Sequence, residues 1–197
     1  MTSFEFAFSL FGLVLGLALA EVLGGFVRVL KARTASASSN VAIRIGWQTP
    51  LLGLLVTLDL ISFWLGAWED REIVPIDFAP LVFVCAVAGI YYAAASLIFP
   101  DDPERWPNLD DWFERHKSQV AAGILIANLC FSLGEVMLTG TYSNSVPGRV
   151  SQLIYLSLAG ALIVTKRKAH SLVVIGLMLL VFAVLAARPA LIAAFGP

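Results

Sequence analysis

Charge is scarce in this sequence. Only 14% of the 197 residues are Asp, Glu, Lys or Arg, whereas 59% are apolar. Soluble domains have about 25% charged and 45–50% apolar residues, so a soluble fold of this composition would leave too much apolar surface in water. We therefore expect an all-α integral membrane protein in contact with the lipid bilayer.

Other absences exclude further classes of protein. The net charge of −1 provides no basic field for nucleic acid. The two cysteines, Cys85 and Cys130, lie in apolar runs and are too few for a disulfide framework. The N-terminal MTSFEF lacks the basic residues of a signal peptide, so we expect the first apolar run to remain as a helix. The small size and the missing N-x-S/T sequon favour a bacterial inner membrane.

No motif identifies a reaction or a ligand. The G-x-S-x-G elbow, the P-loop and the dinucleotide-binding glycine pattern are missing from the sequence. His116 and His170 lie at predicted helix ends, away from the depth where haem or zinc ligands on facing helices would be needed. We expect no enzyme activity, no cofactor and no metal.

Six apolar runs are long enough to cross a bilayer, which takes about 20 residues. The predicted spans cover about residues 4–30, 44–68, 79–99, 117–139, 149–166 and 170–191. The fifth span is the shortest and carries several polar side chains. The chain is therefore predicted to form one six-helix transmembrane domain.

Lys and Arg gather in alternate joints between the spans, which sets orientation in a membrane. Ten of the thirteen follow the first, third and fifth spans: Arg28, Lys31, Arg33, Arg44, Arg105, Arg115, Lys117, Lys166, Arg167 and Lys168. The other side keeps Arg71, Arg149 and Arg188. We expect loops 31–43, 100–116 and 166–170 to be cytoplasmic and both termini to lie outside.

The acids of the 100–116 loop lie where helix starts favour them. Asp102 before Pro103 predicts one helix start, and Asn108 with Asp110 and Asp111 predicts a second near residue 109. We interpret these residues as caps and not as metal ligands.

Small residues recur every four positions in the first helix, at Gly12, Gly16, Ala20 and Gly24. Such a face lets two helix backbones approach closely in lipid. Packing within the chain and a homo-oligomer seam both fit this pattern.

Three carboxylates interrupt the apolar spans: Glu21, Asp59 and Glu135. Each costs about 2.5–3.5 kcal/mol on insertion scales and therefore needs a partner, water or a proton. On a functional interpretation they line a path for a proton, a cation or a small solute. Asp59 has no basic residue within one turn and is expected to be neutral most often.

On a structural interpretation the carboxylates form ion pairs that hold helices together. Glu21 would pair with Arg28 or Arg44 from the inner side. Glu135 would pair with Arg188, and Arg149 is its other candidate partner from the outer side.

Polar residues near the ends of two spans extend the functional interpretation. Pro50 predicts a kink in the second helix, where Gln48 and Thr49 could satisfy freed backbone groups or line an inner vestibule. In the fifth helix Gln152 and Tyr155, with Ser151, could line an outer vestibule.

LALAEVLGG around Glu21 resembles FSLGEVMLTG around Glu135, three spans apart. An inverted 3+3 helix repeat, as in many transporters, would account for the similarity, and so would chance in a biased composition. Taken together, we expect a small polytopic protein that moves an ion or solute past the intramembrane carboxylates. The alternative is a non-transporting scaffold, sensor or assembly module.

Overall fold

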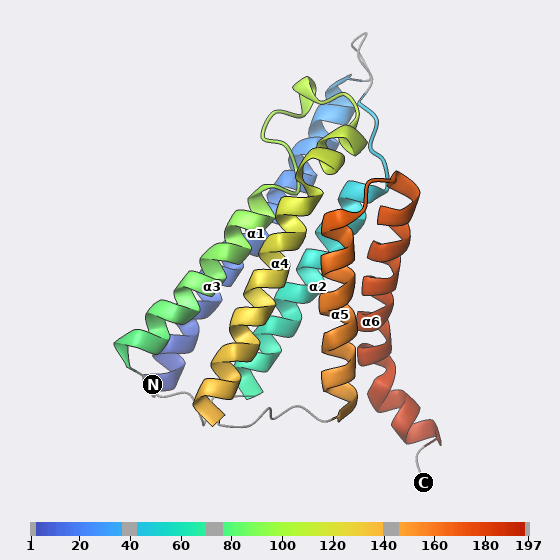
Figure 1. Cartoon of the computed structure of the whole chain (residues 1–197). Helices are drawn as coiled ribbons and strands as arrows, with labels where there is room; N and C mark the ends of the chain where they lie inside the picture. The colour runs from blue at the N-terminus through green and yellow to red at the C-terminus, as the bar shows by residue number, and fades with distance from the viewer. Residues whose placement is uncertain (1–2, 37–42, 70–76, 140–145, 196–197) are drawn as a thin grey trace.

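The computed structural model describes residues 3–36, 43–69, 77–139 and 146–195 (Figure 1). All regular structure in these ranges is helical, which confirms the predicted all-α class. The helices are α1 (Ser3–Ser36), α2 (Gln48–Glu69), α3 (Phe78–Ser96), the short 3₁₀ helix η2 (Pro103–Arg105), α4 (Leu109–Thr139), α5 (Val146–Val164) and α6 (Lys168–Phe195).

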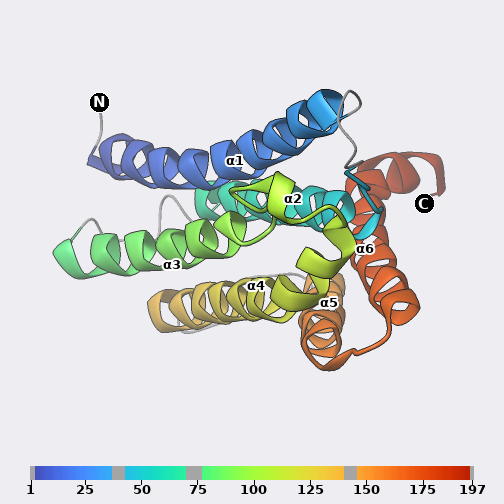
Figure 2. The same ribbon diagram turned by 90° about the horizontal axis from the view of Figure 1, so that it is seen from above.

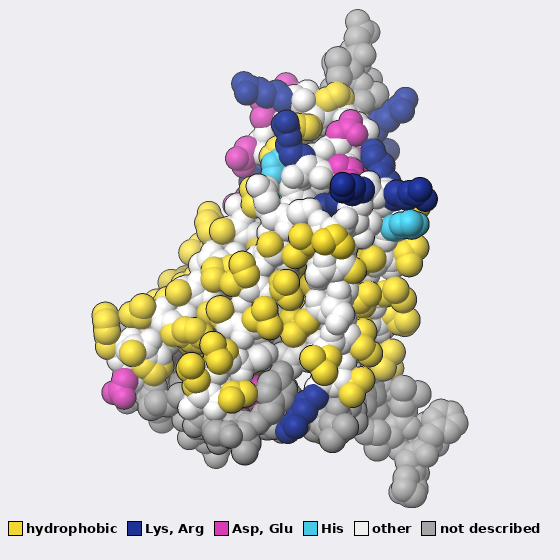
Figure 3. Space-filling model, in the orientation of Figure 1, with side chains coloured by type: hydrophobic (Ala, Val, Ile, Leu, Met, Phe, Trp, Pro, Cys, Tyr) yellow, Lys and Arg dark blue, Asp and Glu magenta, His cyan; other side chains and the backbone are white. Residues whose placement is uncertain are grey.

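The six long helices form a bundle around α2. α2 contacts α1, α3, α4 and α6, while α1, α3, α4, α5 and α6 follow one another in an arc around it (Figure 2). Successive helices run in opposite directions, so the α1–α2, α3–α4 and α5–α6 connections share one end of the bundle (Figure 1). Lys and Arg side chains gather there (Figure 3), and we name it the basic end. The opposite end, which carries both termini, is the terminal end.

The sides of the bundle are apolar, as a bilayer requires. Five helices are long and apolar enough to cross a membrane, and only 17–39% of the residues in their most apolar windows are buried. The outward-facing remainder includes exposed large hydrophobic side chains on all six long helices, and such side chains cover much of the face shown in Figure 3. In α5 the apolar segment Gly148–Val164 is shorter, in line with the prediction that the fifth span is the shortest. The chain is therefore a helical membrane protein.

The helix boundaries correct two sequence predictions. The second helix begins at Gln48 and not at residue 44, so Pro50 lies in its first turn, where no intrahelical donor is required. The predicted proline kink is therefore wrong. The first helix continues to Ser36, so the predicted loop 31–43 is partly helical.

The predicted start of the fourth helix near residue 109 is confirmed. α4 begins at Leu109, and the Asn108 side-chain oxygen accepts a hydrogen bond from the Asp110 N–H at 3.3 Å. The other predicted cap differs. Pro103 does begin a helix, but the Asp102 carboxylate binds Arg105 at 2.8 Å instead of capping it.

The small residues of α1 divide between two environments. A methyl group at Gly12 would come within 2.6 Å of the Trp64 ring, so Gly12 packs against α2. Gly16 meets nothing within 4 Å, and Ala20 is exposed. Packing within the chain, one of the two interpretations of this pattern, therefore does not hold for Gly16 or Ala20. A homo-oligomer seam at these two positions stays a prediction.

The helix pairings give the inverted repeat no support. In the first half α1 packs most extensively against α3, whereas in the second half α4 packs along α5 and α5 along α6. A 3+3 repeat predicts matching pairs in the two halves. The similarity between the sequences around Glu21 and Glu135 therefore has no counterpart in the packing.

Candidate polar site inside the bundle

Asp59 lies at the middle of α2, the central helix, and only 1% of its surface is exposed. Tyr91 of α3 and Asn128 of α4 turn their polar groups toward its carboxylate. The Tyr91 hydroxyl donates to Asp59 Oδ2 at 2.8 Å, and Asn128 Nδ2 donates to the same oxygen at 3.2 Å. These three residues join three helices through one carboxylate.

Asn128 connects the members of this group. Its Nδ2 lies 3.0 Å from the Tyr91 hydroxyl and 2.9 Å from the carbonyl oxygen of Ile124 one turn earlier. A bond to its own helix therefore orients the Asn128 side chain, which also donates to Asp59. All partners that the structure gives the Asp59 side chain are neutral, and no Lys, Arg or His is among them.

Tyr155 of α5 completes the surroundings of the carboxylate. Its hydroxyl lies beside Asp59, but the geometry falls short of a hydrogen bond, and the oxygen has no other partner in the part of the chain that the structure describes. The residue is only 5% exposed. A third buried donor thus lies next to Asp59 without a hydrogen bond to it. We name Asp59, Tyr91, Asn128 and Tyr155 the central cluster.

A polar line leads from the central cluster toward the terminal end. The Ser132 hydroxyl donates to the Asn128 carbonyl oxygen at 2.9 Å, and Gln152 of α5 donates to Ser132 at 2.6 Å. Glu135 follows Ser132 by three residues on the same side of α4 and is buried. The structure thus brings four of the predicted path residues, Asp59, Glu135, Gln152 and Tyr155, to one side of α4.

The predicted partners of Glu135 lie at its end of the bundle. Arg149 is exposed near the start of α5, and the side chain of Arg188 lies outside the described residues. The pairing of Glu135 with Arg188 therefore stays a prediction.

Sequence reasoning missed Tyr91 and Asn128. Each carried a weak signal, since Asn128 interrupts the apolar run AGILIANLCF and Tyr91 lies in the interior of α3. A buried amide or phenol in lipid needs a partner just as a carboxylate does. Pairing these residues with Asp59 would have identified the cluster.

Glu21 lies apart from the central cluster. It accepts a hydrogen bond from Arg28 at 2.7 Å, which is the pair that the structural interpretation predicts. The two residues are two turns apart on α1, and a methyl group at Gly24 would lie 3.7 Å from the Arg28 guanidinium. This is an ordinary van der Waals contact, so the Glu21–Arg28 pair does not require a glycine at position 24. The alternative partner Arg44 instead pairs its backbone with Pro107 and Leu109.

Gln48 and Thr49 tie helix ends together at the basic end. Gln48 Nε2 donates to the Lys168 carbonyl oxygen at 3.0 Å, and the Thr49 hydroxyl donates to the Leu109 carbonyl oxygen at 3.2 Å. Both side chains are buried and link α2 to the first residues of α6 and α4. These bonds place both side chains in contacts between helices, and the inner vestibule stays a prediction.

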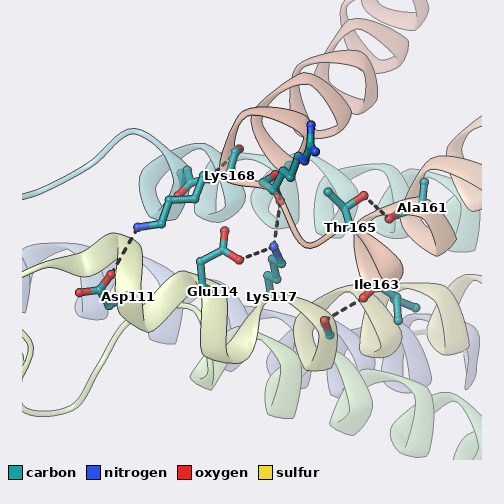
Figure 4. A network of polar contacts seen from close by, with 11 residues as sticks. Asp111, Glu114, Lys117, Ala161, Ile163, Thr165 and Lys168 are labelled. Carbon is teal, nitrogen blue, oxygen red and sulfur yellow. Dashed lines mark hydrogen bonds and ion pairs between the residues drawn. The ribbon is translucent and has the colours of Figure 1, made fainter.

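A buried lysine dominates the same region. Lys117 of α4 is 3% exposed, ion-pairs with Glu114 and donates to the Ser171 hydroxyl of α6 at 2.9 Å (Figure 4). Nearby, Lys168 of α6 binds Asp111 of α4 at 3.3 Å (Figure 4). We name Lys117, Glu114, Ser171, Lys168 and Asp111 the basic-end network.

An apolar layer separates the basic-end network from the central cluster. Lys117 and Asn128 are eleven residues apart on α4, or about 16 Å of helix at 1.5 Å per residue. The interval is filled by buried side chains from four helices: Leu52, Leu55, Val56, Ala121, Ile124, Leu162 and Ile175. The polar line from Asp59 therefore stops at this layer on the basic side.

A small apolar cavity of about 40 Å³ adjoins the cluster on its terminal side. Its lining includes Phe63, Val87 and Phe131, each about one turn beyond Asp59, Tyr91 and Asn128 respectively. Phe63 also packs against the Tyr91 ring at 5.1 Å between centroids. The cavity lining carries no polar side chain, so the polar groups that lead toward Asp59 on this side lie on α4 and α5.

Within the described ranges no group of three or more His, Cys, Asp or Glu side chains is arranged to hold a metal ion. Comparison of the chain with protein-family models, with curated proteins and with solved structures found no match in any of the three. Its function must therefore be argued from the buried polar groups themselves.

Proposed function

We propose that this chain moves protons across a membrane and that Asp59 is the protonatable group in their path. The observation that carries the proposal is a carboxylate at the centre of the bundle with hydroxyl and amide neighbours and no cationic partner. An ionised carboxylate in apolar surroundings is costly unless it is hydrogen-bonded or takes up a proton. The hydroxyl and amide groups of the central cluster can form hydrogen bonds with Asp59 in both its ionised and its protonated form.

The proton fits this site better than a metal ion or a larger solute. The neighbours that reach Asp59 are O–H and N–H donors at 2.8 and 3.2 Å, whereas a bound cation such as Ca²⁺ requires several oxygen ligands. The adjoining cavity has an apolar lining, which suits no polar solute. A proton needs only a line of hydrogen-bonding groups, which Ser132 and Gln152 extend toward Glu135.

One observation favours the competing function of a non-transporting scaffold or sensor. Glu21 is held in an ion pair with Arg28, so this carboxylate serves the fold of α1. If Asp59 were likewise structural, its hydrogen bonds would only fix α2 against α3 and α4. Proton flux separates the two functions.

The test is proton flux into liposomes that enclose a pH-sensitive dye. Asp59→Asn should reduce the flux to the background of empty liposomes, since an amide cannot exchange the proton. Glu69→Gln makes the same chemical change on an exposed residue of α2 and should leave the flux unchanged. Equal flux from the wild type and a folded Asp59→Asn variant would contradict the proposal.

We also propose that the basic end faces the cytoplasm of a bacterial cell and both termini face outward. The support is the positive-inside distribution of Lys and Arg. Single cysteines replacing Thr34 and Asp77, after removal of Cys85 and Cys130, test this orientation. Asp77→Cys should react with a membrane-impermeant maleimide on intact cells and Thr34→Cys should not. The reverse pattern would contradict the orientation.

A further inference from the structure

The helices that surround the central cluster are tied together by side chains at the basic end. Thr49 joins α2 to α4, Gln48 joins α2 to α6, and Ser118 of α4 donates to the Ile163 carbonyl oxygen of α5 at 3.0 Å. Lys117 and Lys168 add two links between α4 and α6. With the apolar layer beneath them, these bonds close the bundle between the basic end and Asp59.

Lys117 differs from the other members of these ties. It is 3% exposed, whereas the Lys168 and Asp111 side chains are 51% and 60% exposed. A buried ion pair adds little net stability over an apolar pair of the same volume, because both charges must leave water. Such pairs are best attested as devices that fix a register or a switch.

The position of Lys117 matches such a device. Its ammonium joins the Glu114 carboxylate on α4 to the Ser171 hydroxyl on α6 (Figure 4). Ala121, one turn further along α4, is fully buried and begins the apolar layer. A path from Asp59 to the basic end must pass this layer, and it opens if α6 moves away from α4.

We infer that Lys117 is the latch of a gate at the basic end: its bonds to Glu114 and Ser171 hold α6 against α4 and keep water from the apolar layer. This inference rests on the proposed proton path, since a gate has a purpose only if something passes. Opening the latch exposes Ala121 to water from the basic end while the central cluster keeps its hydrogen bonds.

The experiment measures the reactivity of a cysteine in the apolar layer and does not depend on transport. Ala121→Cys is introduced after removal of Cys85 and Cys130, and the purified protein in nanodiscs reacts with a charged, water-soluble maleimide. Adding Lys117→Met should raise the labelling rate at least about tenfold, because it leaves the Glu114 carboxylate and the Ser171 hydroxyl without their shared partner in the closed bundle. Lys168→Met, which breaks only the exposed pair, should change the rate less than about twofold.

A second variant and a second reporter guard against misfolding. Ser171→Ala removes the α6 end of the latch with a smaller change and should raise labelling of Ala121→Cys in the same direction. Ala88→Cys, at a buried position on α3, should stay unreactive in every variant. Unchanged labelling in Lys117→Met and Ser171→Ala, or equal increases at both reporters, would overturn the gate. Absence of proton flux in the wild type would contradict the proposed proton path alone, because the labelling rates are measured without transport.

Discussion

Two buried polar groups contact the same helix, α4, and they are built on different principles. At the basic end the Lys117 ammonium meets the Glu114 carboxylate, and the charges are paired. At the centre the Asp59 carboxylate meets only hydroxyl and amide groups. A charge that is paired with an opposite charge keeps the same bonds. A carboxylate without a cationic partner in an apolar interior is costly when ionised, so its free energy changes when it gains or loses a proton. The comparison separates a group suited to holding helices from one suited to exchange.

The largest effect is expected from Asn128→Ala, because Asn128 serves both Asp59 and Tyr91. The variant leaves a buried carboxylate with one donor fewer, which should lower the free energy of unfolding by about 3 kcal/mol. Proton flux should fall as well. Unfolding in denaturant and liposome flux measure the two effects. Ser157→Ala, which removes an exposed hydroxyl that donates to the Leu153 carbonyl oxygen of its own helix, is the control and should cost clearly less.

The two tyrosines of the central cluster should respond differently to loss of the hydroxyl. Tyr91→Phe removes a donor at 2.8 Å from Asp59 and should cost about 1–3 kcal/mol of unfolding free energy. Tyr155→Phe removes a hydroxyl without a partner, so its cost should stay within about 0.5 kcal/mol. Thermal unfolding of both variants checks this, and equal destabilisation would mean that Tyr155 supports Asp59 as strongly as Tyr91 does.

Ser171→Ala should show that the basic end is held by bonds to a charged group. The Ser171 hydroxyl accepts from Lys117 at 2.9 Å and is fully buried. Its loss should lower the unfolding free energy by about 1.5–3 kcal/mol, the usual range for a hydrogen bond to a charged group. Ser157→Ala on exposed α5 surface is the matched control. No difference between the two variants would remove the contrast with the central cluster.

The smallest effect is expected from Lys168→Met. Its pair with Asp111 is exposed on both sides, and exposed pairs contribute about 0–1 kcal/mol. High salt should mimic the variant, because exposed charges are screened and buried ones much less so. A salt-sensitive melting temperature in the wild type that Lys168→Met abolishes would confirm the assignment of this bond.

The helices were predictable from the sequence because the length of an apolar run reports membrane depth. The start of α4 was predictable because a capping residue, Asn108, and acids in the first turn, Asp110 and Asp111, are a local sequence pattern of helix N-termini. Depth, however, says nothing about the side of the helix on which a residue lies. In lipid every side of a helix is apolar, so the pattern that separates a buried face from an exposed one in water is missing.

That missing information accounts for the errors. Gly16 and Ala20 share a spacing with Gly12, yet only Gly12 meets another helix. The alternation of Lys and Arg predicts the end of the bundle at which Lys117 lies, but it does not indicate that the side chain turns into the bundle. The partners of Asp59 come from residues 32 and 69 positions away, and no local pattern connects them.

The Glu21–Arg28 pair has a consequence for how the chain enters a membrane. Both residues belong to α1 and are seven positions apart, so the bond can form as soon as this one helix exists. The first helix can therefore leave the translocon with Glu21 and Arg28 already paired. Within the described residues of α2, the Asp59 carboxylate has no hydrogen-bond partner. Its donors Tyr91 and Asn128 are synthesised later, so the Asp59 carboxylate gains these hydrogen bonds only after α3 and α4 have been inserted. The carboxylate of α1 thus has its partner within the same helix, whereas the stable insertion of α2 depends on the helices that follow.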